Sequence, residues 1–114
     1  MQVINSITIL GLLTSSLIAN AEDRGKAYVS NQEGGVSVIN LNTMETEGSI
    51  DIQAKNPRGI GVTEDGRYLI TANKDDDNLS VIDLKTNQFV KHISVGKNPE
   101  LIRVHKGQVF VSTE

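Results

Sequence analysis

The sequence predicts an all-β protein, an incomplete β-propeller in which each blade is a sheet of four antiparallel strands. Two observations predict this fold. The sequence repeats itself with a period of about 42 residues, and each repeat contains four short runs rich in Val, Ile and Thr, which favour strands. Four strands in a repeat of this length match one propeller blade. Residues 22–114 therefore hold about two to two and a half blades.

The repeat is visible in three pairs of similar segments. Residues 27–31 recur as residues 69–73, residues 36–41 recur as residues 79–84, and residues 55–57 recur as residues 97–99. The pairs follow one another in the same order and at nearly the same spacing. A leucine-rich repeat would be shorter, and a helical repeat would place its apolar residues with a period of about 3.6, which this sequence lacks.

The second repeat is the complete one. Its four strands are expected at residues 59–63, 68–73, 79–84 and 89–95, separated by Asp-Gly and Asn-rich turns. Consecutive apolar residues such as Val81 and Ile82 indicate strands that neighbouring sheets bury on both faces. The first repeat opens with a second strand at residues 26–31, and the third ends after its second strand. We therefore expect the chain to be a piece of a larger ring.

Composition and charge exclude several classes of function. The 114 residues include 11 basic and 14 acidic side chains, so the net charge is -3 and no basic footprint for nucleic acid is expected. The chain has no cysteine, which excludes disulfides, zinc–cysteine sites and covalently attached c-type haem.

Residues 1–21 are expected to be a secretory signal peptide. They carry no charged side chain, and they end in Ala19-Asn20-Ala21, the pattern of small residues that signal peptidase recognises. The alternative is a buried N-terminal strand or helix of the domain. Cleavage after Ala21 would place the mature protein, without a membrane span, in the periplasm or outside the cell.

Four segments resemble a known family. Residues 28–31, 36–40, 63–67 and 93–99 are similar to the YVTN-type β-propeller repeat, which is found in YncE-like exported proteins. The resemblance covers residues 26–114 and implies a ring of seven blades. It implies little about activity, because this repeat serves binding proteins as well as cofactor-dependent enzymes.

A ligand of such a ring is expected at the mouth of the central channel. The loops that line the mouth are expected at residues 32–35, 54–58, 74–78 and 96–100. Arg58 and Glu100 occupy equivalent positions after the repeated Asn-Pro pair but carry opposite charges, so we expect them to contact the ligand. The alternative is that both are solvated charges at the rim.

Other polar residues have structural explanations. Proline restricts the residue before it, so Asn56 and Asn98 are expected to be extended. Asn40 and Asp83 are expected to cap the turns between the third and fourth strands.

Metal chemistry is weakly supported. The acidic run at residues 75–77 offers carboxylates but lacks the spacing of a calcium loop, and a solvated turn is the alternative. His92 is expected to be exposed on an outer strand, and His105 ends an inner strand without an evident partner. The sequence assigns no catalytic residue, no metal site and no cofactor.

Two classes of function remain open. The first is an exported scaffold that binds a protein, peptide or polysaccharide through the loops of its top face. The second is a periplasmic enzyme or cofactor carrier, such as a quinone-type dehydrogenase or a lactonase, with its site at the central channel.

Overall fold

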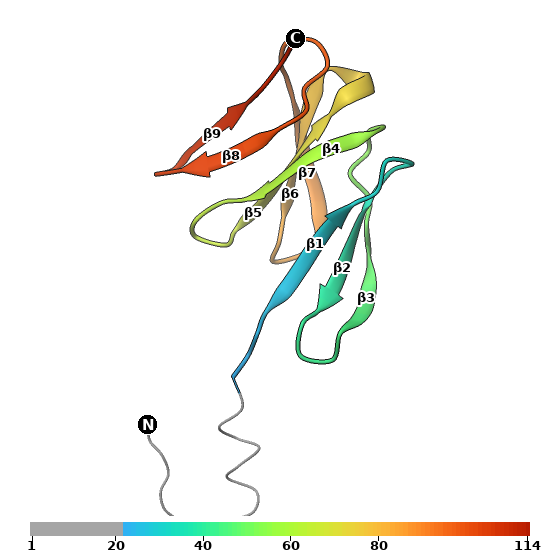
Figure 1. Ribbon diagram of the computed structural model, residues 1–114, viewed down its shortest axis with the longest axis vertical. Coiled ribbons are helices and arrows are strands. Elements are labelled where there is room, and N and C mark those ends of the chain that lie inside the picture. The colour runs from blue at the N-terminus through green and yellow to red at the C-terminus, as the bar shows by residue number, and fades with distance from the viewer. Residues whose placement is uncertain (1–21) are drawn as a thin grey trace, which may run out of the picture.

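The computed structural model describes residues 22–114, and the expected signal peptide lies outside this part of the chain. The described residues form three antiparallel sheets (Figure 1). The strands are β1 (Lys26–Ser30), β2 (Val36–Asn40), β3 (Glu45–Ile50), β4 (Pro57–Val62), β5 (Tyr68–Asn73), β6 (Asn78–Asp83), β7 (Gln88–Ser94), β8 (Ile102–His105) and β9 (Gln108–Val111). Strands β1–β3 form the first sheet, β4–β7 the second, and β8 and β9 the third.

This architecture confirms the predicted incomplete propeller. The second sheet is a whole four-stranded blade, and the other two sheets supply three and two strands. Strand β5 has the predicted bounds, and the remaining strands differ from the prediction only at their ends. Strand β4, for example, already begins at Pro57, because the first position of a strand tolerates a residue that has no N–H. Within residues 22–114, no helix is long or apolar enough to cross a membrane.

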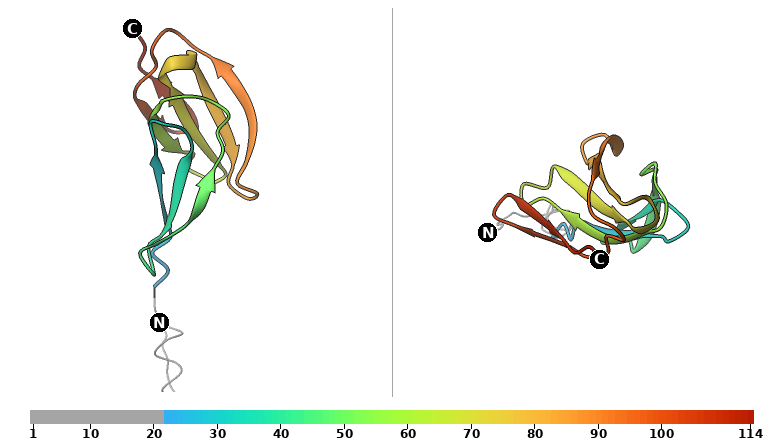
Figure 2. Two further views of the ribbon diagram at one scale, coloured as in Figure 1. Left: turned by 90° about the vertical axis from the view of Figure 1, so that its right-hand side faces the viewer. Right: turned by 90° about the horizontal axis from the view of Figure 1, so that it is seen from above.

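The second sheet is buried on both faces, as the consecutive apolar residues predicted. Leu69 and Ile82 pack against the first sheet, whereas Ile70 and Val81 pack against the third. Strand β7 is the outer edge of the second sheet and is mostly exposed (Figure 2). The two cores therefore lie between sheets, which is how propeller blades are held together.

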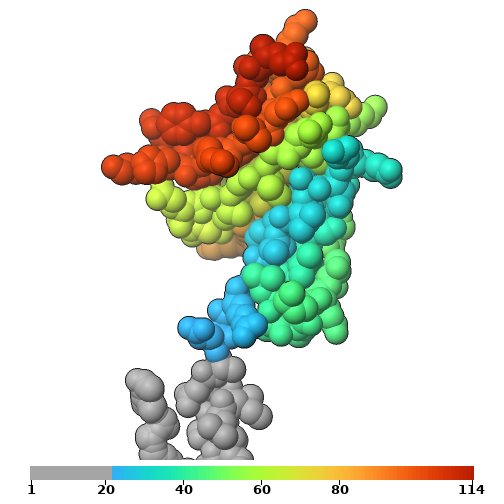
Figure 3. Space-filling view, viewed as in Figure 1, coloured from blue at the N-terminus to red at the C-terminus, as the bar shows by residue number. Residues whose placement is uncertain are grey.

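The sheets approach one another most closely along β1, β4 and β8, which lie side by side in Figure 3. Glycine permits this approach. A Cβ atom at Gly59 would lie 2.5 Å from the carbonyl oxygen of Glu100, and one at Gly61 would lie 2.7 Å from Cγ2 of Ile102. The two glycines thus allow β8 to pack closely against β4. They therefore also set the distance between the loops at the ends of these two strands.

The first interface also contains a buried polar seam. Thr71, Asn73 and Ser80 are fully buried. The Asn73 amide donates to the Ser80 hydroxyl over 2.8 Å, and that hydroxyl donates to the backbone carbonyl of Ile52 in the first sheet's half of the interface over 2.7 Å. Hydrogen bonds satisfy the polar atoms of this seam, so burying them does not leave uncompensated groups.

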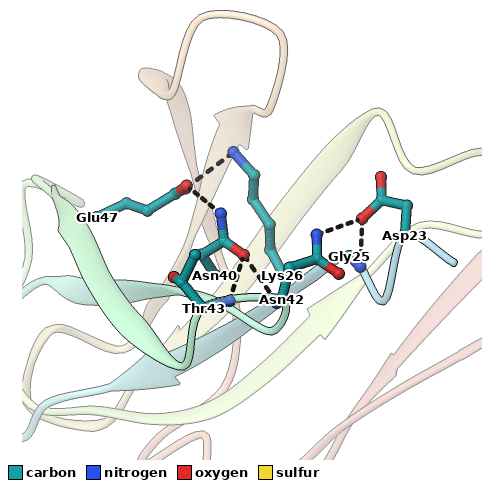
Figure 4. Close-up of polar contacts among 7 residues, drawn as sticks. All are labelled: Asp23, Gly25, Lys26, Asn40, Asn42, Thr43 and Glu47. Carbon is teal, nitrogen blue, oxygen red and sulfur yellow. Dashed lines mark hydrogen bonds and ion pairs between the residues drawn. The ribbon is translucent and has the colours of Figure 1, made fainter. Parts of the chain in front are cut away.

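The predicted turn caps are confirmed. Asn40 Oδ1 accepts hydrogen bonds from the backbone amides of Asn42 and Thr43 (Figure 4). Asp83 Oδ1 accepts one from the backbone amide of Lys85. Arg67 also binds both carboxylate oxygens of Asp83. The Arg67 guanidinium holds the pKa of Asp83 below its usual value of 3.8.

The same end of the first sheet anchors the segment that precedes β1. Asp23 accepts hydrogen bonds from the side chain of Asn42 and the backbone amide of Gly25, which together lower the pKa of Asp23 (Figure 4). Lys26 forms an ion pair of 3.0 Å with Glu47. These contacts tie Asp23, two residues after the expected cleavage site, to the first sheet.

Candidate functional site

The candidate site is the group of loops at the upper end of the second sheet in Figure 1. It comprises residues 51–56 between β3 and β4, residues 74–77 between β5 and β6, which include the 3-10 turn η1 (Lys74–Asp76), and residues 95–101 between β7 and β8. Hydrogen bonds and one ion pair join residues 74–77 to both of the other loops. We call these three segments the channel-mouth loops.

The acidic run holds the other two loops in place. Asp75 Oδ1 accepts a hydrogen bond from the side-chain Nδ2 of Asn56, and Asp76 Oδ2 accepts one from the backbone amide of Lys55 over 2.8 Å. On the opposite side, Asp77 Oδ1 accepts one from the backbone amide of Asn98 over 2.9 Å. The three carboxylates are exposed to solvent, as expected for a solvated turn, but each also accepts a hydrogen bond from a neighbouring loop. Among residues 22–114, no cluster of three His, Cys, Asp or Glu side chains could hold a metal ion.

The prediction that Asn56 and Asn98 are extended is wrong. Their φ angles are 52° and 49°, in the left-handed region. Asparagine tolerates this region better than most residues, and the loop contacts stabilise it here. The backbone carbonyl of Asn56 accepts a hydrogen bond from the backbone amide of Lys74, and the backbone amide of Asn98 donates to Asp77 Oδ1. Hydrogen bonds to residues 74–77 therefore outweigh the restriction imposed by the following proline.

The structure brings Glu100 close to two cations. Lys74 Nζ lies 2.9 Å from Glu100 Oε2. The hydrogen bond from Lys74 is the main cause of a lowered pKa at Glu100, followed by the charge of Lys74, and the charge of Arg58 adds to the effect. Arg58, on β4, is exposed and has no ion-pair partner within 4 Å among residues 22–114.

Sequence reasoning did not single out Lys74. It opens the loop that was expected at residues 74–78, but its role depends on a contact with Glu100, which belongs to the next repeat. Comparison of the repeats offers one signal. Asn31 and Asn73 are equivalent positions, but the residue that follows is an uncharged Gln32 in the first repeat and a charged Lys74 in the second.

The two histidines lie apart from these loops. His92 is exposed on β7, as expected, and its ring packs at 60° against Phe89 with the ring centroids 4.6 Å apart. His105 is exposed at the end of β8. A shallow hollow of about 300 Å³ is lined by Asp51, Gln53, Asn87, Gln88 and Phe89, and thus by neither Arg58 nor Glu100.

Comparison with known proteins agrees with the fold. The family model described as "Lactonase, 7-bladed beta-propeller" matches residues 12–106. Hydrazine synthase from Kuenenia stuttgartiensis superposes with a TM-score of 0.75 at 29% identity, over 80% of this chain and 26% of that one. No curated protein matches the chain significantly.

Two more distant structures share the fold alone. The dihydro-heme d1 dehydrogenase NirN, solved in complex with DHE, has a TM-score of 0.59 at 23% identity, over 82% of this chain and 21% of that one. The Cps50 (Swd1) β-propeller domain from Myceliophteria thermophila has a TM-score of 0.54 at 12% identity, over 81% of this chain and 39% of that one. The chain therefore spans about a quarter of the first two structures.

Proposed function

Because the chain belongs to the seven-bladed β-propeller family described by the name lactonase, we propose that it forms a sector of such a ring and binds a partner at the channel-mouth loops. The partner is a protein, peptide or polysaccharide that presents an anionic group to Arg58. We also infer that its repeats are of the YVTN type found in YncE-like exported proteins.

One observation carries the proposal: Arg58 lies close enough to the Lys74–Glu100 ion pair for its charge to act on Glu100, yet no ion pair among residues 22–114 involves Arg58. Lys74 and Glu100 pair with each other, which leaves the exposed guanidinium of Arg58 available. Arginine binds carboxylates with two parallel hydrogen bonds. The bracing of both neighbouring loops by the acidic run also limits the loss of conformational entropy when a partner binds.

The experiment uses oligogalacturonate and oligoglutamate as anionic probes, with uncharged oligoglucose as a reference. Arg58→Ala should weaken binding of the anionic probes by roughly tenfold or more, the usual effect of removing a charged hydrogen bond. Glu100→Gln should strengthen it, because Lys74 then also becomes available. Arg103→Ala changes an exposed arginine on β8 and is the matched control.

Equal affinity of the natural chain, Arg58→Ala and Arg103→Ala for both acidic probes would contradict the proposal. Binding of oligoglucose with the same affinity would show that charge is not what the loops recognise.

The second candidate is an enzyme or cofactor carrier with its site at the central channel. The family name favours it, and its nearest forms are a lactonase or a quinone-type dehydrogenase. Ring opening of dihydrocoumarin above the uncatalysed rate, lost in Arg58→Ala but retained in Arg103→Ala, would favour this candidate over the scaffold.

Export is also part of the proposal. It is supported by the uncharged residues 1–21 and by the Ala19-Asn20-Ala21 ending. Intact-mass measurement of the periplasmic fraction of an expressing bacterium should give a chain that starts at Glu22. Recovery of the chain from the cytoplasm with Met1 retained would contradict it.

A further inference from the structure

The hollow that Phe89 lines adjoins a second hollow between the first and second sheets. The first has a volume of about 300 Å³ and the second a volume of about 240 Å³, and Asn87 lines both. Strand β3 and the segment after it form one wall, and residues 87–89 at the start of β7 form the other. Neither Arg58 nor Glu100 lines either part. We call the two hollows together the inter-sheet trough.

The smaller hollow is open because residue 48 is a glycine. Gly48 lies opposite Val38 on β2, so a side chain there would point into the space between the sheets, as Val38 does. A Cβ atom at Gly48 would meet nothing within 4 Å. The equivalent residue of the second repeat is Lys91, opposite Val81. Val38 and Ile50 are buried and line this hollow. The first repeat therefore has an apolar notch with room for a methyl group.

The larger hollow combines amides, one carboxylate and one aromatic ring. The amides of Gln53, Asn87 and Gln88 have no hydrogen-bond partner among residues 22–114. Asp51 uses Oδ1 to accept a hydrogen bond from the backbone amide of Gln53, whereas its Oδ2 accepts none from this part of the chain. The ring of Phe89 is half-buried. Amide groups both donate and accept hydrogen bonds, so they match the hydroxyl groups of a sugar.

The charge of the trough argues against an anionic ligand. No Lys, Arg or His among residues 22–114 lines either hollow. The smaller hollow includes Glu47, but its carboxylate already pairs with Lys26 over 3.0 Å. Asp51 is therefore the one lining carboxylate without a basic partner in the described residues.

The repeat does not itself require the polar residues of the larger hollow. Asp51 and Gln53 correspond to Ser94 and Gly96 of the next repeat. Gln53 also has a φ of 55°, which is uncommon for a residue other than glycine, asparagine or aspartate. Its hydrogen bond to Asp51 stabilises this conformation. A strained residue that the fold does not require is typical of a binding site.

From these features we propose that the inter-sheet trough binds an uncharged sugar that carries an acetamido group. The acetyl methyl group enters the notch at Gly48. A sugar ring packs its C–H face against Phe89. Asp51 accepts hydrogen bonds from the sugar, and the three amides donate to and accept from its hydroxyl groups. Because Asn87 lines both hollows, a disaccharide can occupy them together.

The experiment compares three disaccharides. Diacetylchitobiose, chitobiose and cellobiose share one ring skeleton and differ in carrying acetamido, protonated amino and hydroxyl groups at the same positions. Saturation-transfer NMR observes the sugar and gives its affinity by titration. Diacetylchitobiose should bind at least about tenfold more tightly than the other two, the usual effect of one small apolar group in a matching pocket. Its acetyl methyl protons should receive the strongest saturation.

Two variants test the notch and the amide that joins the two hollows. Gly48→Leu fills the notch and should weaken diacetylchitobiose binding by about tenfold or more. Thr46→Leu adds the same side chain at an exposed position of β3 outside the trough, so it should leave the affinity unchanged.

Asn87→Gly removes the shared amide and should weaken binding by roughly tenfold. Met44→Gly is its matched control, because Met44 is the equivalent turn residue of the first repeat. Their φ angles are 57° and 62°, which glycine adopts readily. Circular dichroism checks that each variant is folded.

Arg58→Ala should leave diacetylchitobiose binding unchanged, which separates the trough from the channel-mouth loops. Loss of binding in that variant would instead assign the sugar to those loops. Equal affinity for the three sugars, or tighter binding of the cationic chitobiose, would overturn the proposal. Undiminished binding in Gly48→Leu and Asn87→Gly would place the sugar elsewhere on the chain. Absence of saturation transfer to diacetylchitobiose at millimolar concentration would also overturn it.

Discussion

At the scale of single residues, the spacing of the sheets depends on glycine. Gly59 and Gly61 face β8, whereas Ile60 and Val62 of the same strand pack against the core between the first and second sheets. The close approach of β8 to β4 therefore depends on the two positions that carry no side chain.

Gly59→Ala should destabilise the chain by about 1–3 kcal/mol, the usual cost of overpacking. The added methyl group would lie 2.5 Å from a backbone oxygen of Glu100, which cannot rotate away as a side chain would. Chemical denaturation measures the change. Gly48→Ala is the control, since a Cβ atom there meets nothing within 4 Å, and it should stay within about 0.5 kcal/mol of the natural chain. Equal stability of the two variants would contradict this description of the β4–β8 contact.

At the scale of elements, one short turn organises two loops. The turn η1 is too short to have a hydrophobic face of its own, and no residue in it is buried. Its effect comes from the carboxylate of Asp76, which reaches the loop before β4, and from that of Asp77 directly after the turn, which reaches the loop before β8. Each loop can therefore be released separately.

Asp76→Ala should speed hydrogen exchange at the Lys55 amide by roughly three- to tenfold, the range expected for loss of one hydrogen bond. Exchange at the Asn98 amide should stay unchanged. Asp77→Gly should have the reverse effect, and glycine is chosen because Asp77 has a φ of 52°, which alanine adopts poorly. Exchange that rises at both amides in both variants would mean that the turn unfolds as a unit.

Most of the strands could be predicted from the sequence, whereas the loop contacts could not. Strand β5 was predicted with its correct bounds because the apolar pattern of residues 68–73 recurs at residues 26–31. The left-handed Asn56 was missed because its conformation depends on Asp75 and Lys74, about twenty residues away. A repeat shows which positions are equivalent, but it does not show which side chains meet across neighbouring repeats. Arg58 and Glu100 were predicted as ligand-binding residues, whereas the ion pair between Glu100 and Lys74 was not predicted.

At the scale of the whole molecule, the described residues leave apolar surface uncovered. Leu101, directly before β8, is 62% exposed, and Phe110 on β9 is 55% exposed on the side of the third sheet that faces away from the second core. The edges of β1 and β9 have no strand partner among residues 22–114. Exposed edges next to apolar faces favour association between molecules.

Residues 22–114 should therefore self-associate at micromolar concentration, with sedimentation coefficients that rise with concentration. Phe110→Ser should lower the tendency, because it removes the largest apolar side chain of the uncovered face. Met44→Asn is the control, since Met44 is 71% exposed but lies in the turn between β2 and β3. A dilute sample that stays monomeric across this range and melts in one sharp transition would contradict the prediction.

The bracing of two loops by one turn has a consequence for how such a ring can change over evolution or in the laboratory. The loop before β4 and the loop before β8 belong to different repeats, yet both take their conformation from carboxylates of the turn between β5 and β6. If either loop alone were exchanged for a loop of another propeller, the carboxylate that holds it would lose its hydrogen-bond donor. New specificity is therefore more readily acquired by moving residues 51–101 as one cassette than by altering a single loop.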